Sequence, residues 1–159
     1  MDYYDHISEG YDELYRDEQI KKLNIIKSKI KIRNNSKLLD VGCGSGMSSD
    51  FGCFVVGIDP SMGLLKNNPN KNKIIGIAEM LPFRDGSFDW VISVTAMHNF
   101  DDAEKSINEA KRAGKNDFVF SVLKKSEKFD KIIGIIHKNF EVYNAVGEDK
   151  DVIFFCRKP

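Results

Sequence analysis

The sequence predicts a single α/β domain with a mostly parallel β-sheet that ends in an antiparallel hairpin. Three observations support this fold class. Short apolar runs alternate with helix-like segments, as they do in βαβ units. These runs are continuously apolar, which indicates strands buried on both faces. The chain has 159 residues and neither repeats nor linker-like tracts, so one hydrophobic core is expected.

Three helices are expected from apolar residues that recur at helical spacing. The first, near residues 17–31, follows the acidic turn RDEQ and carries Ile20 and Leu23 on one face. The second covers DDAEKSINEAKRAG, which begins with acidic residues and stops at Gly114. The third has a wide apolar stripe formed by Phe129, Ile132, Ile133, Ile136 and Phe140.

Five strands are expected from runs rich in Val, Ile and Phe that are bounded by Gly, Asp or Asn. They are KLLDVG at 37–42, CFVVGID at 53–59, KIIGI at 73–77, FDWVISV at 88–94 and DFVFSVL at 117–123. The C-terminal tail adds two strand-like runs around GEDKD, which predicts a hairpin. Only MSSDFG separates the glycine-rich turn from the second strand, so the first crossover helix is expected to last about a turn and a half.

The composition argues against several function classes. Lys plus Arg and Asp plus Glu both total 24, so no basic surplus indicates binding to nucleic acid or to an anionic membrane. The N-terminus lacks an apolar leader and no run of about eighteen apolar residues occurs, so the expected location is the cytoplasm and no membrane span is expected. The three cysteines form no CxxC pair and the three histidines are scattered, so no metal site is predicted.

The stretch LLDVGCGSG, residues 38–46, carries the strongest functional signal. Its glycines have the spacing G-x-G-x-G, and Met47 stands where a dinucleotide fingerprint needs glycine, which disfavours a nicotinamide-dependent oxidoreductase. Asp40 precedes the turn, where a carboxylate repels a pyrophosphate and attracts an ammonium or sulfonium group. Asp59 ends the second strand, the place of an acidic residue that binds ribose hydroxyls. The expected ligand is a nucleoside conjugate that carries positive charge.

Four blocks of sequence carry a family resemblance. LLDVGCGSG, VVGIDPSMGLL, AEMLPFRDGSFDWVISVTAMHNF and the terminal hairpin resemble the class I S-adenosylmethionine-dependent methyltransferases, particularly the subgroup that includes quinone-biosynthesis C-methyltransferases. The resemblance spans residues 36–157 and implies a Rossmann-like, seven-stranded, mostly parallel sheet. It also implies that S-adenosylmethionine is the cofactor. Residues 1–35 would form an N-terminal lid or helix packed on a cofactor-binding domain at 36–159.

The resemblance also implies which residues bind the cofactor. Asp40 would lie near its amino group, and the backbone of residues 42–44 would surround its methionine part. Asp59 would hold the ribose hydroxyls, Met62 would pack on the adenine, and the methyl-transfer side would include the segment from 95 to 98. The complete predicted set is Asp40, Gly42, Cys43, Gly44, Asp59, Met62, Ala78, Glu79 and Thr95. No metal ligand belongs to it.

The roles of the remaining polar residues stay open at this point. His98 is a candidate base that removes a proton from the substrate, or else a structural or substrate-orienting residue. The N-terminal aromatic residues and one histidine either staple the first helix to the domain or form a mobile lid; they are Tyr3, Tyr4, His6, Tyr11 and Tyr15.

The function expected from this pattern is methyl transfer from S-adenosylmethionine to an unidentified acceptor, either a small molecule or an RNA or protein. Some relatives that modify ribosomal RNA or translation factors need a small zinc-binding activator subunit, so such a partner is expected as well. The alternative is a non-catalytic module that keeps the fold for protein interaction. The intact glycine turn with Asp40 and Asp59 favours the enzyme.

Overall fold

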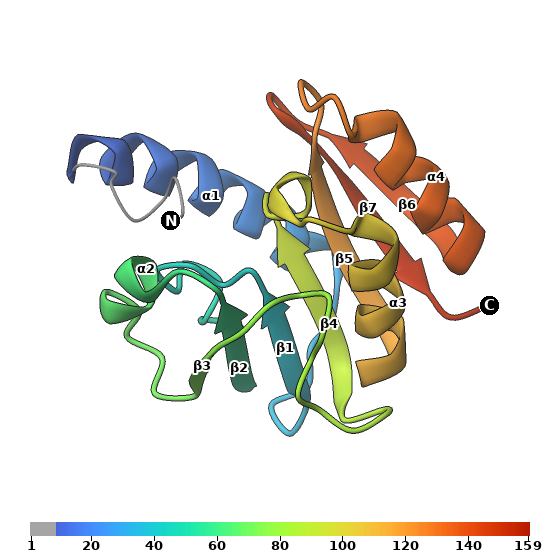
Figure 1. Cartoon of the computed structure of the whole chain (residues 1–159), viewed down its shortest axis with the longest axis horizontal. Coiled ribbons are helices and arrows are strands. Elements are labelled where there is room, and N and C mark those ends of the chain that lie inside the picture. The colour runs from blue at the N-terminus through green and yellow to red at the C-terminus, as the bar shows by residue number, and fades with distance from the viewer. Residues whose placement is uncertain (1–8) are drawn as a thin grey trace.

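The computed structural model describes residues 9–159, with side chains from residue 13 onward. These residues form one seven-stranded sheet in the order β3-β2-β1-β4-β5-β7-β6 (Figure 1). The strands are β1 Lys37–Val41, β2 Phe54–Asp59, β3 Lys73–Ile75, β4 Phe88–Val94, β5 Gly114–Leu123, β6 Glu141–Gly147 and β7 Asp151–Arg157. β1 to β5 are parallel, whereas β7 is antiparallel to both β5 and β6. The predicted sheet and terminal hairpin are confirmed.

The three helices predicted from apolar spacing are present, and two short helices are additional. They are α1 Glu9–Lys29, α2 Met62–Lys66, the 3-10 helix η2 Met97–Asn99, α3 Ala103–Ala113 and α4 Phe129–Asn139. α1 begins earlier than the apolar spacing indicates, because its first turns carry little apolar signal. The short helix α2 begins where Ser61 accepts a hydrogen bond from the backbone amide of Leu64. Asp102 caps α3 in the same way, and the helix ends before Gly114 as predicted.

The prediction of a short helix between the glycine turn and β2 is wrong. Residues 47–53 form only turns and bends. Gly46 and Gly52, with φ of 86° and 67°, take left-handed conformations that a continuous right-handed helix does not contain. Phe51 is buried here and packs in one cluster with residues of α1, with Met47 against it. An aromatic side chain therefore covers the sheet where the crossover helix was expected.

Two cores lie on opposite faces of the sheet because neighbouring strand residues point to opposite sides. On one face, Leu38 and Ile92 pack in a cluster with Leu23 and Ile26 of α1. On the other face, a larger cluster joins Leu39 and its neighbours to α3 and α4. Figure 1 shows α3 and α4 in front of the sheet and α1 behind it.

The strand order places the site. β1 lies between β2 and β4, so the chain leaves β1 toward one edge of the sheet and leaves β4 toward the other. Loops after these two strands therefore diverge and leave a crevice at the carboxyl ends of the strands.

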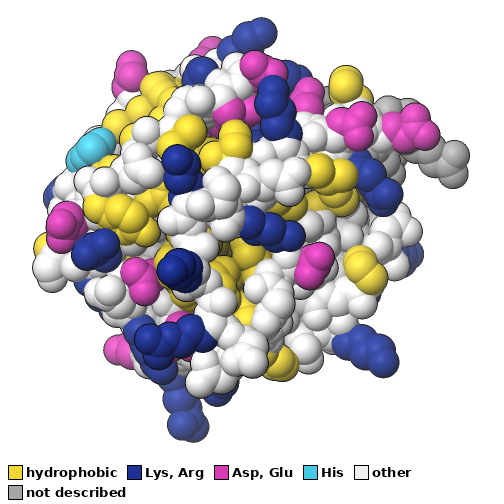
Figure 2. Space-filling model, turned by 180° about the vertical axis from the view of Figure 1, so that it is seen from behind, with side chains coloured by type: hydrophobic (Ala, Val, Ile, Leu, Met, Phe, Trp, Pro, Cys, Tyr) yellow, Lys and Arg dark blue, Asp and Glu magenta, His cyan; other side chains and the backbone are white. Residues whose placement is uncertain are grey.

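The surface and the helices add two facts about the whole chain. Figure 2 shows basic and acidic side chains interspersed over the rear face, in line with 24 residues of each sign. Within residues 9–159, no helix combines the length and apolarity that crossing a lipid bilayer requires.

Candidate cofactor site

The glycine turn follows β1 and approaches β4 very closely. Gly42 and Gly44 have φ of 80° and 49°, a region that side chains rarely adopt. A Cβ atom added to Gly42 would lie 2.5 Å from the Cβ of Ala96, just beyond β4. The backbone amide of Gly42 donates to the carbonyl of Ile58 at 2.8 Å, which ties the turn to β2. Gly42 is therefore required both by its conformation and by the close contact.

Asn68 supports the turn from its outer side. It is 3% exposed, and its Nδ2 donates to the carbonyl of Gly44 at 3.0 Å. A Cβ atom on Gly46 would lie 2.3 Å from Asn68 Oδ1, so this position also needs glycine. Sequence reasoning missed Asn68, because in NNPNKN it looks like one loop residue among several.

Asp59, the last residue of β2, presents its carboxylate to the cleft. Its Oδ2 accepts a hydrogen bond from the backbone amide of Gly44 at 2.9 Å, and its Oδ1 accepts one from the amide of Ser61 at 2.8 Å. Two backbone donors hold the carboxylate in one orientation. The glycine turn and Asp59 therefore form one rigid unit.

Asp40 lies beneath the turn and is 2% exposed. Its Oδ2 accepts a hydrogen bond from the hydroxyl of Ser48, whereas Oδ1 is buried with no hydrogen-bond partner among the described residues. Burial raises the pKa of Asp40 from 3.8 to about 7; the Ser48 hydrogen bond opposes this shift and the charge of Asp59 adds to it. A cation placed against Oδ1 would satisfy that oxygen and favour the ionised carboxylate.

The cleft brings together five residues of the predicted cofactor set. They are Gly42, Cys43, Gly44, Asp59 and Thr95, which line one continuous pocket between the ends of β1, β2 and β4. Burial and two nearby carboxylates raise the pKa of the Cys43 thiol, so it remains protonated and unreactive. The other predicted residues do not line this pocket.

Those other residues lie around the cleft. Asp40 is the buried residue under its floor. Met62 begins α2 and is 52% exposed, whereas Ala78 is buried in the core cluster that includes α3 and α4. Glu79 accepts a hydrogen bond from the backbone amide of Asp102 at 3.3 Å through Oε1.

His98 lies in η2 and lines a second cavity, with Leu14, Lys150 and others. This cavity shares Tyr15 and Thr95 with the first cleft, so the two are neighbours. Nδ1 of His98 is buried without a hydrogen-bond partner among the described residues. Burial is the main reason why the pKa of His98 lies below its usual value, so the imidazole is uncharged at neutral pH and can accept a proton.

Helix α1 supplies cleft residues that the sequence reasoning missed or left undecided. Tyr15 and Gln19 both line the cleft, and Gln19 is 3% exposed. Their spacing with Lys22, at i, i+4 and i+7, puts three polar residues on a buried helix face, and this is the signal that could have found them. Tyr3, Tyr4 and His6 lie outside the described residues, as does the side chain of Tyr11.

The donor set fits an adenosine conjugate with a positive charge. Asp59 offers carboxylate oxygens, Asp40 offers a buried oxygen without a hydrogen-bond partner among the described residues, and Gly42 and Gly44 present backbone without side chains to the cleft. Leu64 and Phe100 add apolar walls. A pyrophosphate would meet the repulsion of two carboxylates instead.

The family assignment rests on comparisons with known proteins. The chain matches the methyltransferase domain family over residues 39–122, more than half of its length. An uncharacterized protein of Methanocaldococcus jannaschii is 33% identical over 160 residues, which cover 96% of this chain and 63% of the relative. The demethylmenaquinone methyltransferase of Renibacterium salmoninarum is 38% identical over 87 residues, which cover 50% of this chain and 37% of the relative. The chain therefore spans less than two thirds of the length of these curated relatives.

A solved structure shows the same fold over the whole chain. A chain of the complex between the Haloferax volcanii Trm112 methyltransferase activator and a methyltransferase superposes on 100% of this chain and 99% of its own length, with a TM-score of 0.83 and 16% identity. The fold expected from the resemblance is thereby confirmed. Taken with the match over residues 39–122, this places the chain in the methyltransferase domain family.

Proposed function

We propose that this protein binds S-adenosylmethionine in the cleft and transfers its methyl group to an acceptor. The observation that carries the proposal is the pair of carboxylates at the ends of β1 and β2. Asp59 is held by two backbone amides and faces the cleft, while Asp40 keeps one buried oxygen without a hydrogen-bond partner. Ribose hydroxyls suit the first carboxylate and an α-ammonium group suits the second.

Within this proposal, the chain's residues bind and orient. The backbone of residues 42–44 approaches the methionine part closely because glycine leaves space there. Leu64, Met62, Ala78 and Glu79 would hold the adenine, and of these four residues Leu64 lines the cleft. When bound, the cofactor supplies a methyl group that its sulfonium makes electrophilic. Most of the rate acceleration then comes from holding the acceptor in line with that methyl group.

The second cavity is the proposed acceptor site. It adjoins the cleft at Thr95 and Tyr15, and His98 lines it with a pKa lowered by burial. An uncharged imidazole at that place can take the proton that an acceptor loses on methylation. In this arrangement residues 36–159 form most of the cofactor site, and the helical part of residues 1–35 adds a wall that the cofactor cleft and the acceptor cavity share at Tyr15.

Binding of S-adenosylhomocysteine, measured by calorimetry, tests the first half of the proposal. The wild-type protein should bind with a Kd in the micromolar range, and Asp59→Ala should abolish binding while the fold is kept. Asp50→Ala is the matched control, because this aspartate side chain is 94% exposed and lies away from the cleft. Unchanged affinity in Asp59→Ala would contradict the placement of the ribose.

Label transfer tests the second half. Protein incubated with S-adenosylmethionine labelled on the methyl group should label one fraction of a size-separated cell extract, and that fraction distinguishes a small acceptor from RNA or protein. His98→Gln should lower the rate without changing the affinity for S-adenosylhomocysteine. Binding of the cofactor with no label in any fraction would favour a non-catalytic interaction module.

We further propose that a small zinc-binding activator subunit covers the edge of the sheet at β3. Three-residue β3 is an edge strand. Exposed apolar side chains gather on it and on adjoining segments; they are Phe54, Met62, Ile74, Ile75, Ile77 and Met80. An unprotected apolar edge is a site for pairing with another chain. The structural similarity to a chain of the complex between the Haloferax volcanii Trm112 methyltransferase activator and a methyltransferase supports an activator as the partner.

Titration with the Haloferax volcanii Trm112 activator tests this partner. Wild-type protein should form a 1:1 complex in size-exclusion chromatography, and Ile75→Lys combined with Met80→Lys should prevent it. Tyr143→Lys is the control, because Tyr143 is 39% exposed on β6, at the opposite edge of the sheet. A complex that survives the β3 substitutions would exclude this edge as the binding surface.

A further inference from the structure

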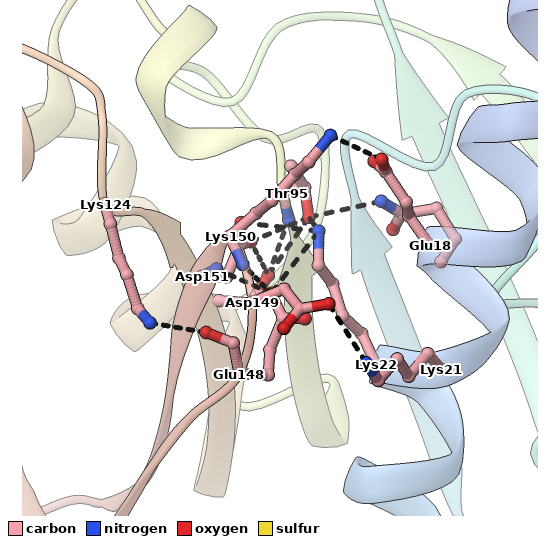
Figure 3. A network of polar contacts seen from close by, with 11 residues as sticks. Glu18, Lys21, Lys22, Thr95, Lys124, Glu148, Asp149, Lys150 and Asp151 are labelled. Carbon is pink, nitrogen blue, oxygen red and sulfur yellow. Dashed lines mark hydrogen bonds and ion pairs between the residues drawn. The ribbon is translucent and has the colours of Figure 1, made fainter.

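A buried ion pair joins the N-terminal helix to the C-terminal hairpin. Lys22 of α1 is 1% exposed and is among the largest fully buried side chains in the described part of the protein. Its Nζ lies 3.3 Å from Oδ1 of Asp151, which begins β7 and is 0% exposed. Glu148 adds a second carboxylate at 4.0 Å. Figure 3 shows Lys22 reaching from α1 into this group. Charged pairs are rarely buried so completely, so the arrangement calls for a physical reason.

Thr95 lies at the centre of the same group. Its Oγ1 accepts a hydrogen bond from Nζ of Lys22 at 2.9 Å and donates one to Oδ2 of Asp151 at 2.8 Å. Gln19 donates to the same hydroxyl at 3.3 Å. The backbone amide of Thr95 donates to Oγ of Ser121 at 2.7 Å, and that hydroxyl in turn donates to Asp151 at 2.9 Å. Both the backbone and the side chain of Thr95 are therefore held by polar partners.

The conformation of Thr95 needs such support. Its φ is 51°, and it is the one non-glycine residue with positive φ in the described chain. A β-branched residue rarely adopts the left-handed region. Where it does, the surrounding structure must hold it there. The hydrogen bonds to Lys22, Asp151 and Ser121 hold Thr95 in this conformation.

The turn at Thr95 sets the wall of the cleft. Thr95 stands between Val94, the end of β4, and Ala96, and all three residues line the cofactor cleft. Ala96 is also the residue that comes closest to Gly42, since a Cβ atom on Gly42 would lie 2.5 Å from the Cβ of Ala96. A relaxed, extended Thr95 would move Ala96 relative to the glycine turn.

Two further ion pairs surround the buried one, but they are exposed. Lys21 pairs with Asp149 at 3.1 Å, with side chains that are 59% and 79% exposed, and Lys150 pairs with Glu18. The two outer pairs join α1 to the turn between β6 and β7, and the buried pair joins α1 to the first residue of β7 (Figure 3). Exposed pairs are screened by water and contribute little, so they cannot replace the buried one.

We propose that Lys22 and Asp151 are positioning residues for the cofactor site: through Thr95 they hold the end of β4 against the glycine turn. The inference rests on the proposed function only in taking the cleft to bind the cofactor. Neither residue lines that cleft, so both act through Thr95 rather than on the ligand.

The test replaces both members of the closer ion pair, and Glu148 keeps the hydrogen bonds that it accepts from the backbone amides of Lys150 and Asp151. Lys22→Met keeps a similar volume and Asp151→Leu keeps the number and branching of the side-chain heavy atoms, and such apolar replacements of buried ion pairs often preserve stability. We expect the double variant to fold and to bind S-adenosylhomocysteine at least about tenfold more weakly than the wild type, as measured by calorimetry. Lys21→Met is the matched control, the same substitution at the neighbouring exposed pair, and should leave the affinity unchanged.

A glycine at position 95 separates positioning from general stability. Glycine adopts positive φ without support, so in the Thr95→Gly background the double substitution should change the affinity less than about threefold. Wild-type affinity in the double variant, or an equal loss in both backgrounds, would overturn the proposal. The coupling constant between the amide and Hα protons of residue 95 reports φ without any ligand, and it should move to extended-backbone values in the double variant. If wild-type protein fails to bind S-adenosylhomocysteine, the proposed function falls, and this coupling constant alone decides the inference.

Discussion

Asp40 and Asp151 are both buried at the same end of the sheet, but their surroundings differ. Oδ2 of Asp151 accepts hydrogen bonds from Thr95 and Ser121, and Oδ1, which has no hydrogen-bond partner among the described residues, is paired with the cation of Lys22. Asp40 has one hydroxyl partner, no cation near enough for an ion pair within the described residues, and an oxygen without a hydrogen-bond partner. A buried carboxylate that is paired with a cation stabilises the protein in one arrangement, whereas one without a cation beside a cleft leaves room for a positively charged ligand.

The difference also concerns distance along the chain. Asp40, the glycine turn and Asp59 lie within two neighbouring strands and the loop between them. The partners of Asp151 come from α1, from the end of β4 and from β5. One side of the cleft is therefore built locally, and the opposite side is built by residues that meet only after the whole sheet has formed.

The largest expected effect comes from leaving Asp151 without its cation. Lys22→Met alone should lower the free energy of unfolding by about 3 to 5 kcal/mol, because it leaves an uncompensated buried charge. Urea denaturation measures this loss. Adding Asp151→Leu should recover most of it. A single variant that lost less than about 1 kcal/mol would show that water reaches the pair.

A second substitution tests the side of the cleft that the glycine turn forms. Gly42→Ala should destabilise the protein by about 2 kcal/mol, since it combines a left-handed φ with a close contact to Ala96. Gly134→Ala is the control: it lies within α4 with no atom within 4 Å of an added Cβ, and it should be neutral or stabilise by about 0.5 to 1 kcal/mol. Equal effects at the two positions in thermal denaturation would contradict the close approach.

The pH dependence of ligand binding tests the incomplete surroundings of Asp40. Its pKa is raised to about 7, so the carboxylate is mostly protonated at pH 6 and mostly ionised at pH 8. If the ionised form binds the ammonium group, the affinity for S-adenosylhomocysteine should rise about tenfold from pH 6 to pH 8. Calorimetry should show no such rise in Asp40→Asn.

The effect of pH on the stability of the fold is opposite to its effect on the affinity for the ligand. Because the pKa of Asp40 is higher in the folded state than its ordinary value of 3.8, its contribution to stability is complete below about pH 4. That contribution is lost as the pH rises through about 7. Higher pH therefore favours the ligand complex while it weakens the ligand-free fold, and stability measured without ligand should show the opposite trend to affinity.

The smallest expected effect on stability is at the exposed pair of Lys21 and Asp149. Lys21→Met should change the free energy of unfolding by no more than about 0.5 kcal/mol, because both partners are largely in water. The comparison with Lys22→Met uses one helix and one type of substitution, so it isolates burial as the cause. A large loss at Lys21 would mean that the outer pairs share the role assigned to the buried one.

The strands and the two later helices could be predicted from the sequence because their signals are local. FDWVISV is rich in aromatic and β-branched residues and becomes β4, Phe88–Val94, and the stop at Gly114 marks the end of α3. The crossover after the glycine turn could not be predicted in the same way. Only the structure shows that Phe51 packs with α1 and makes a helix there unnecessary.

For the site, the sequence by itself determined the glycine turn, Asp40 and Asp59, because strand ends and tight turns depend on short stretches of sequence. Only the tertiary structure decided that α1 forms a wall of the cleft and that Thr95 is held in a left-handed conformation by Lys22 and Asp151. The physical reason is that a buried ion pair between residues 22 and 151 leaves no periodic or local pattern. Its partners meet only when β7 is placed beside β5 and α1 covers the sheet.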